Sequence, residues 1–208
     1  MNVETRPRLD RDSRREAILD VAAEVFMEVG YSAASMSMIA ARVGGSKGTL
    51  YNYFRGKEEL FEAHIARHCA WQLEAMDKLY SRGGDVRSAL MELGRTFLRF
   101  VLSGFCLRNF TLVIAEAGRA PEIGRLFHEA GPLRAATRLA EFMAQVAGED
   151  RLRPCDPHVA AHQFIGLCQN RLLKARLCNA IPEPTEAEIA TEVAAAVETF
   201  MAAYGPAA

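Results

Sequence analysis

A short segment near the N-terminus gathers side chains that could bind a nucleic acid. Lys47 carries a positive charge suited to a phosphate, and Thr49 has a hydroxyl that can bond to a phosphate oxygen or a base edge. Gly48 lacks a side chain, so backbone N–H groups could come close to a phosphate. Tyr51 and Tyr53 offer hydroxyls for phosphate and ring edges for a thymine methyl group. The predicted chemistry is therefore noncovalent recognition of DNA.

The local charge supports this reading. The whole chain of 208 residues has 25 Lys and Arg against 26 Asp and Glu, a net charge of −1. The stretch from Arg42 to Lys57, in contrast, holds four basic residues and no acidic one. A near-neutral chain that concentrates positive charge in one segment can still attract phosphate there. A solvated charged face without a partner is the alternative that charge alone leaves open.

Two short helices around Gly44-Gly45 would present these side chains. Ser37 is expected to cap the first helix, and Ser46 the second. The glycine pair permits the positive φ of a tight turn. Leu50 and Phe54 lie four residues apart and would pack toward a core, on the side opposite to Lys47 and Tyr51. This layout is a helix-turn-helix.

The chain as a whole predicts an all-α fold of about nine helices without a convincing strand, because apolar residues recur at helical spacing. Ser13 to Glu16 has the pattern of a capping box that starts the first helix, which Gly30 would end. Gly118 and Pro121 would interrupt the helices in the middle of the chain. Asp156-Pro157 would start a helix that runs to about Cys178, and the capping box Thr185 to Glu188 would start the last helix.

Residues 12 to about 72 resemble the DNA-binding domain of TetR-family transcriptional regulators. The motifs that carry the resemblance are Gly30-Tyr31, Ser37-x-Ile39-Ala40, Ser46 to Phe54 and Lys57 to Phe61. Gly45 departs from the family, which usually has Val there, and this change could loosen the turn. The resemblance implies a homodimer that binds a palindromic operator, usually as a repressor, with the second short helix of each subunit in the major groove. The implied DNA contacts are Ser37, Ser46, Lys47, Gly48, Thr49, Tyr51, Asn52, Tyr53 and Lys57.

The expected domain organisation has three parts. Residues 1–11 would form a flexible arm, and 12–72 the DNA-binding domain, with the helix-turn-helix at about 35–54. Residues 73–208 would form a helical domain for effector binding and dimerisation. This last part is similar to the AefR-like C-terminal domain of one branch of the family, on motifs that include Thr111 to Ala117, Gly131-Pro132 and Gln163 to Leu167.

An effector pocket is expected among the middle helices, because seven of the eleven Phe residues lie between Phe97 and Phe164. Pockets are mostly apolar and use a few polar groups to orient the ligand. The hypothesis is a small hydrophobic or amphipathic effector, and ordinary core packing is the alternative for each residue. The candidate ligand-binding residues are Phe97, Phe100, Val101, Phe105, Asn109, Phe110, Val113, Phe127, His128, Phe142, His162, Phe164, Cys168 and Gln169.

The last two helices are expected to form the homodimer. Both carry apolar stripes, and Ala194 to Ala196 would let helices approach closely in a four-helix bundle across a twofold axis. Intramolecular packing is the alternative reading.

Other functional classes have weaker support. No nucleotide-binding glycine loop or zinc-protease motif is present, so an enzyme is not expected, and no cofactor is predicted. His64/His68 and His158/His162 have the spacing of metal-binding pairs without a clear third ligand. A thiol- or metal-responsive regulator of the same fold remains open, as does a DNA-binding protein indifferent to sequence.

The chain is expected to be cytoplasmic and to have no membrane partner. It has five Cys without a C-x-x-C motif, and its longest stretch without a charged residue has 14 residues.

Overall fold

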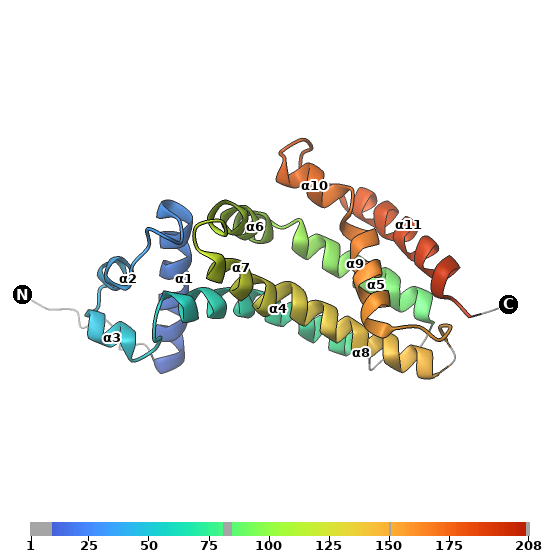
Figure 1. The fold of residues 1–208 in the computed structure, drawn as a ribbon, viewed down its shortest axis with the longest axis horizontal. Coiled ribbons are helices and arrows are strands. Elements are labelled where there is room, and N and C mark those ends of the chain that lie inside the picture. Colours follow the sequence, from blue (N-terminus) through green and yellow to red (C-terminus); the bar gives the residue numbers. More distant parts are fainter. Residues whose placement is uncertain (1–9, 81–84, 150, 207–208) are drawn as a thin grey trace, which may run out of the picture. The chain divides into compact units, whose positions relative to one another are not determined.

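The structure of the chain is a computed structural model that describes residues 10–80, 85–149 and 151–206, without the side chains of residues 71–80. Within these ranges the chain forms eleven α-helices, one π-helical turn and no strand (Figure 1). The all-α prediction is confirmed.

The described chain divides into two compact units. The first contains the described residues up to Ala66 together with Leu112–Phe127, and the second contains Arg67–Thr111 and His128 onward. Two helices, α4 (Lys57–Tyr80) and α6 (Gly104–Glu116), therefore each run from one unit into the other. The expected boundary near residue 72 gave no sign that a later segment, 112–127, returns to the first unit.

The first unit is built from α1 (Arg11–Val29), α2 (Met36–Val43), α3 (Lys47–Tyr51), the start of α4, the end of α6 and most of α7 (Pro121–His128). Its centre is a cluster of three buried rings. Phe26, Tyr31 and Phe61 have ring centroids 5.5 to 5.7 Å apart. Such aromatic contacts add stability beyond the area they bury, so this cluster fixes α1 against α4.

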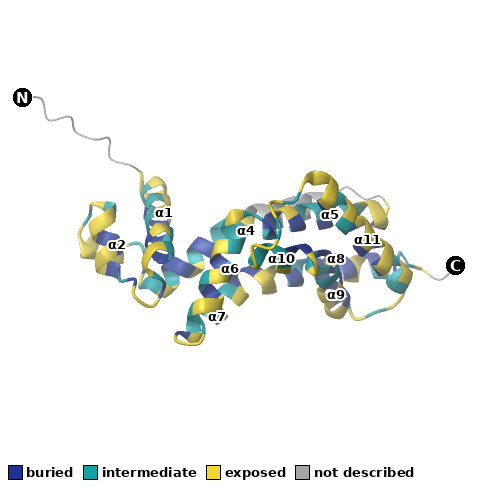
Figure 2. Ribbon diagram, turned by 90° about the horizontal axis from the view of Figure 1, so that it is seen from above, coloured by how far each residue is buried: buried dark blue, intermediate teal, exposed yellow. Residues whose placement is uncertain are grey.

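The second unit packs α5 (Val86–Val101), α8 (Arg134–Gly148), α9 (Pro157–Gln169) and α11 (Glu186–Tyr204) around one apolar core. The π-helical turn Glu129–Leu133 precedes α8, and α10 (Leu172–Leu177) follows α9. The buried residues of this core include Leu90, Met143, Phe164 and Phe200. Figure 2 colours the buried parts of the helices dark blue. Gly94 lets α5 approach α11, because a Cβ there would lie 2.6 Å from a methyl group of Val193.

The predicted helix ends are partly confirmed. Gly30 ends α1 at φ +82°, Asp156 caps α9, and the capping box at Thr185 and Glu188 is formed. Two predicted starts are wrong. Asp10, and not Ser13, caps α1, and Ser35, and not Ser37, caps α2. In both cases a second acceptor side chain stands two or three residues upstream, and the earlier start adds hydrogen-bonded residues to the helix.

The structure has more α-helices than the nine predicted. The segment after Gly118 was expected to be a break, but Pro121 is the first residue of α7, a position that suits its fixed φ. The helix expected from Asp156 to about Cys178 is divided into α9 and α10. At the division, Asn170 and Arg171 keep helical dihedral angles, and neither is Gly or Pro, so no sequence signal marks it.

Within the described ranges, no single helix is long and apolar enough to cross a membrane. The pair α5 and α6, bent by 61°, passes the same length and composition test when taken together.

We expect acid to destabilise the fold through carboxylates that accept hydrogen bonds. The N–H of Ser88 lowers the pKa of Asp85, the guanidinium of Arg99 lowers that of Glu186, and the N–H of Thr185 lowers that of Glu188. A lowered pKa means that the folded state favours the ionised form, so the stabilisation is present at neutral pH and lost as pH falls. The melting temperature, followed by circular dichroism, should therefore fall once the pH drops below about 4.3, the ordinary pKa of Glu. A melting temperature that rises on acidification would contradict this.

Candidate nucleic-acid interface

The helix-turn-helix predicted from the sequence is present. Gly44 ends α2 in the left-handed conformation, at φ +73° and ψ +41°, which favours glycine. The N–H of Gly45 donates to the carbonyl of Ala40 at 3.1 Å, so the turn is hydrogen-bonded despite the missing Val side chain. Ser46 caps α3 as predicted, since its hydroxyl accepts from the N–H of Thr49 at 3.0 Å. The short helix α3 is thus fixed at its start.

The two faces of the segment from Ser46 to Phe54 differ in burial. Leu50 and Phe54 are buried in the first unit, at 3% and 1% exposure. Lys47 and Tyr51 are exposed, and the Lys47 ammonium lies 5.9 Å from the centre of the Tyr51 ring. Of the other predicted contacts, Ser37, Ser46, Gly48, Thr49 and Asn52 are exposed, and Tyr53 is half-buried. The structure therefore leaves most of the predicted contact set available to a partner.

Lys57, at the start of α4, is partly occupied by its own chain. Its ammonium donates to the carbonyls of Tyr31 and Ser32, at 3.0 and 3.4 Å, and lies 4.5 Å from the centre of the Tyr31 ring. These acceptors are neutral, so the positive charge of Lys57 is retained. Lys57 holds the turn between α1 and α2 as well as being a predicted phosphate contact.

The segment that is free of acids in sequence is not free of them in space. Arg42 forms an ion pair with Glu28 of α1, at 2.7 Å. The backbone N–H of Arg55 donates to Glu59, at 2.7 Å. The net positive charge of this surface is therefore smaller than the sequence segment indicates.

Glu116, on the last turn of α6, is a residue that sequence reasoning missed. Its carboxylate accepts hydrogen bonds from the N–H of Ser32, at 3.1 Å, and from the Ser32 hydroxyl. These bonds lower the pKa of Glu116. The carboxylate also lies against Gly30, where a Cβ would be 2.6 Å from Oε1. Glu116 and Lys57 thus hold the same turn, the one that leads into α2.

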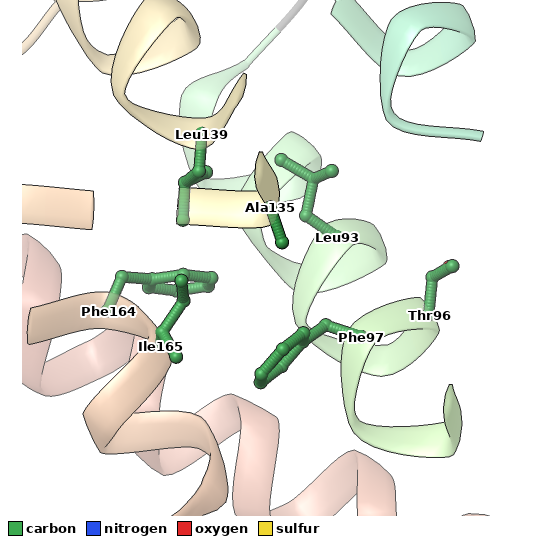
Figure 3. A pocket seen from close by; sticks show the side chains of 7 residues that line it. All are labelled: Leu93, Thr96, Phe97, Ala135, Leu139, Phe164 and Ile165. Carbon is green, nitrogen blue, oxygen red and sulfur yellow. The ribbon is translucent and has the colours of Figure 1, made fainter. Parts of the chain in front are cut away.

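The second unit contains a small apolar cavity of about 20 Å³ (Figure 3). Seven side chains from three helices line it, namely Leu93, Thr96 and Phe97 of α5, Ala135 and Leu139 of α8, and Phe164 and Ile165 of α9. Of the predicted effector contacts, Phe97 and Phe164 are in this lining. The volume is close to that of one water-sized group, so a larger ligand would require side chains to move.

The other predicted effector contacts are dispersed. Val113 and Phe127 belong to the first unit. His128 and His162 are exposed on the surface, while Phe142 and Cys168 are buried in the core of the second unit. The remaining members all lie in the second unit, and they are Phe100, Val101, Phe105, Asn109, Phe110 and Gln169.

Three cysteines of the second unit, Cys69, Cys106 and Cys168, are wholly or partly buried. Burial raises the pKa of Cys69 to about 11 and those of Cys106 and Cys168 to about 12, which disfavours the reactive thiolate. The part of the chain that the structure describes contains no group of three or more His, Cys, Asp or Glu side chains placed to hold a metal. Neither observation favours the thiol- or metal-responsive alternative.

Comparison with known proteins gives two family matches. Residues 18–64 match the family model described as bacterial regulatory proteins, tetR family. Residues 88–206, more than half of the chain, match the C-terminal domain of AefR-like transcriptional repressors. Both matches agree with the resemblances drawn from the sequence motifs.

Comparison with individual proteins also finds transcriptional regulators. The chain is 38% identical over 94 residues to the transcriptional activator FasR of Mycolicibacterium smegmatis, an alignment that covers 45% of this chain and 43% of FasR. Among solved structures, the flavonoid-responsive regulator FrrA is 32% identical with a TM-score of 0.78, covering 94% of this chain and 98% of FrrA. A TetR-family regulator from Mesorhizobium loti, 24% identical, has the same fold with a TM-score of 0.80, covering 95% of this chain and all of that one.

Proposed function

The chain belongs to the TetR family of transcriptional regulators, and on that premise we propose that it binds a palindromic operator as a homodimer and is released by a small effector. It is a DNA-binding regulator and not an enzyme. We propose further that it acts as a repressor and is located in the cytoplasm. Relatives named as an activator and as a repressor both occur, so a reporter gene behind the operator, in cells with and without the protein, tests the direction.

The observation that carries this proposal is that one side of α3 is buried in the first unit while the other side is exposed. Leu50 anchors the helix, while Lys47 and Tyr51 remain exposed on it. Selection of bound sequences from random DNA tests the proposal and should yield a palindrome, because a twofold dimer reads two equal half-sites. A salt series on selected and random DNA then separates the alternatives. Equal affinity for both at every salt concentration would favour a binder indifferent to sequence.

Gly48→Ala is expected to separate DNA binding from folding. A Cβ at Gly48 would meet only the Ser46 hydroxyl, at 3.7 Å, so the folded protein has room for it. Alanine should even stabilise the helix by up to about 1 kcal/mol. If backbone N–H groups approach a phosphate there, the added methyl group should lower operator affinity about tenfold, the cost of one charge-assisted hydrogen bond. Fluorescence anisotropy with labelled operator measures this.

The matched control for Gly48→Ala is Gly148→Ala, which makes the same change at the end of α8, where a Cβ meets nothing within 4 Å. It should not alter operator binding. Unchanged affinity in Gly48→Ala would remove Gly48 from the proposed interface.

The proposed dimer face lies on α9 and α11. Val159 of α9 is 47% exposed, and Gly166, seven residues later on the same helix face, has open space where a Cβ would be. On α11, Ala194 and Ala195 are exposed as well. Small and apolar side chains on two adjacent helices suit the close approach of a second copy in a four-helix bundle.

The proposed effector is hydrophobic or amphipathic and binds among the helices of the second unit. None of the seven residues that line the cavity there is charged. FrrA, which is similar over nearly its whole length, is named as responsive to flavonoids, which supports an aromatic effector here. A screen of lipophilic compounds by melting temperature tests this, and a panel in which no compound raises the melting temperature would count against it.

Release from DNA is proposed to pass through α6. This helix starts in the second unit and ends in the first, where Glu116 holds Ser32 before α2. An effector that prefers one position of α6 can shift the equilibrium only by its difference in affinity for the two arrangements. A small change in the spacing of the two α3 helices would then spoil simultaneous binding to both half-sites.

A further inference from the structure

Asn109 of α6 presents a buried hydrogen-bond acceptor that has no partner. The residue is 2% exposed, and its Oδ1 atom makes no hydrogen bond. Its Nδ2 atom donates to the carbonyl of Phe105, at 2.9 Å. Because that carbonyl can only accept, the amide orientation is fixed and the unpaired atom is the oxygen. An unpaired buried acceptor is costly, so this site favours a molecule that brings a donor.

Aromatic rings pack around Phe105, one helix turn before Asn109 on α6. The ring of Phe105 is stacked on that of His68 from α4, with centroids 3.7 Å apart, and faces Phe100 at 6.4 Å. Phe100 lies on the same stripe of α5 as Leu93, Thr96 and Phe97, which line the cavity, because these residues are spaced by three and four. The contact between the rings of Phe100 and Phe105 therefore places the end of this stripe on α5 next to the turn of α6 that precedes Asn109, which itself does not line the cavity.

The chemistry of the cavity restricts the ligand further. Six of its seven lining side chains are hydrocarbon, and the hydroxyl of Thr96 is the one polar group among them. A carboxylate or phosphate in such surroundings would lose its hydration without gaining a cation. The flat rings of Phe97 and Phe164, both labelled in Figure 3, suit an aromatic body. Phe97 is only partly buried, so fewer neighbours hold its ring in place than hold the buried ring of Phe164.

We propose that the effector is an uncharged phenol whose hydroxyl donates to Oδ1 of Asn109 while its aromatic body occupies an enlarged form of the cavity. This inference rests on the proposed function, and it adds the ligand class and the residue that selects it. Asn109 is seven residues before Glu116 on α6, so both lie on one face of the same helix, about 10 Å apart along its axis. A ligand held at Asn109 thus acts directly on the helix that holds the turn before α2.

The test compares phenols with their methyl ethers, for example 7-hydroxyflavone with 7-methoxyflavone, within a panel of such pairs of one to three rings. Titration calorimetry measures the binding of each to the full chain. Wild-type protein should bind the preferred phenol about tenfold or more tightly than its ether, since the ether cannot donate. In Asn109→Leu this ratio should fall to about one, while the affinity for the ether stays within about threefold.

Two further variants keep the test decisive. If Asn109→Leu lowers the melting temperature, Asn109→Ala replaces it, because it removes the same amide and leaves a smaller side chain. Thr96→Val removes the hydroxyl of the cavity and should keep the preference for the phenol. The inference is wrong if no phenol in the panel binds better than its ether, if the preference survives in both Asn109 variants, or if Thr96→Val abolishes it instead.

Operator binding without any probe separates this inference from the proposed function. Wild-type protein and the Asn109 variants should bind the operator equally, and the phenol should release only the wild type. Normal operator binding without a phenol preference would overturn the ligand class alone. Failure of the wild type to select any operator would overturn the proposed function itself.

Discussion

Tyr51→Ala is expected to weaken operator binding by about 10- to 100-fold, the cost of one lost base or phosphate contact of about 1–3 kcal/mol. The Tyr51 ring is 45% exposed and lies beside the Lys47 ammonium, on the surface opposite to buried Leu50. Because the ring fills no core position, its removal should leave the melting temperature within about 2 °C of the wild type, as for other surface changes. Anisotropy with the selected operator measures the affinity, and circular dichroism the stability.

Two controls define what Tyr51 contributes. Tyr51→Phe keeps the ring and removes the hydroxyl, so it separates contact with a methyl group from a hydrogen bond to phosphate. Leu133→Ala truncates a large side chain of similar exposure, 41%, in the second unit and should leave operator binding unchanged. If Tyr51→Ala lowers stability and operator affinity in parallel, the ring belongs to the packing of the first unit and not to the DNA interface.

Gly166→Arg is expected to convert the dimer into a monomer and to lower operator affinity by about 100-fold or more, because one bound half-site then no longer raises the local concentration of the other. Within one chain a Cβ at Gly166 meets nothing within 4 Å, so the arginine has room and the fold should persist. In the proposed dimer the same side chain would point at the second copy. Sedimentation equilibrium at micromolar concentration measures the mass.

The control for Gly166→Arg is Gly148→Arg, which places the same charge at another helical glycine with open surroundings, on α8 and so outside the two helices of the proposed dimer face. It should remain a dimer and bind the operator normally. A dimeric Gly166→Arg protein would move the interface to another face, and a monomeric wild type would remove the dimer from the proposal.

The parts of the fold that sequence predicted well depend on local rules. A serine at position 46 caps a helix through its neighbour three residues on, and Gly44 accepts a positive φ that other residues resist. The burial of Leu50 and Phe54 follows from helical spacing in the same way. The start of α2 was misplaced because Ser35 and Ser37 satisfy the same local rule, and the sequence does not rank them.

Contacts between distant residues could not be predicted in this way. Ser32 and Glu116 are 84 positions apart, and neither residue type is unusual for an exposed turn or helix end. The pairing of Arg42 with Glu28 likewise depends on how α1 and α2 pack. The effector candidates were dispersed for a related reason, since an aromatic side chain at helical spacing looks the same whether it fills a core or lines a cavity.

Because residues 112–127 belong to the first unit, they limit which segments could be exchanged between related proteins to make functional chimaeras. A chimaera made by joining the first 70 residues of one relative to the remainder of another would bring in a foreign α1–α2 turn but keep the host's residue at position 116. Where the host has Glu116 and the donor lacks a hydroxyl at position 32, the carboxylate would lose a partner. Functional hybrids should therefore need three crossover points, with 112–127 inherited together with the N-terminal helices.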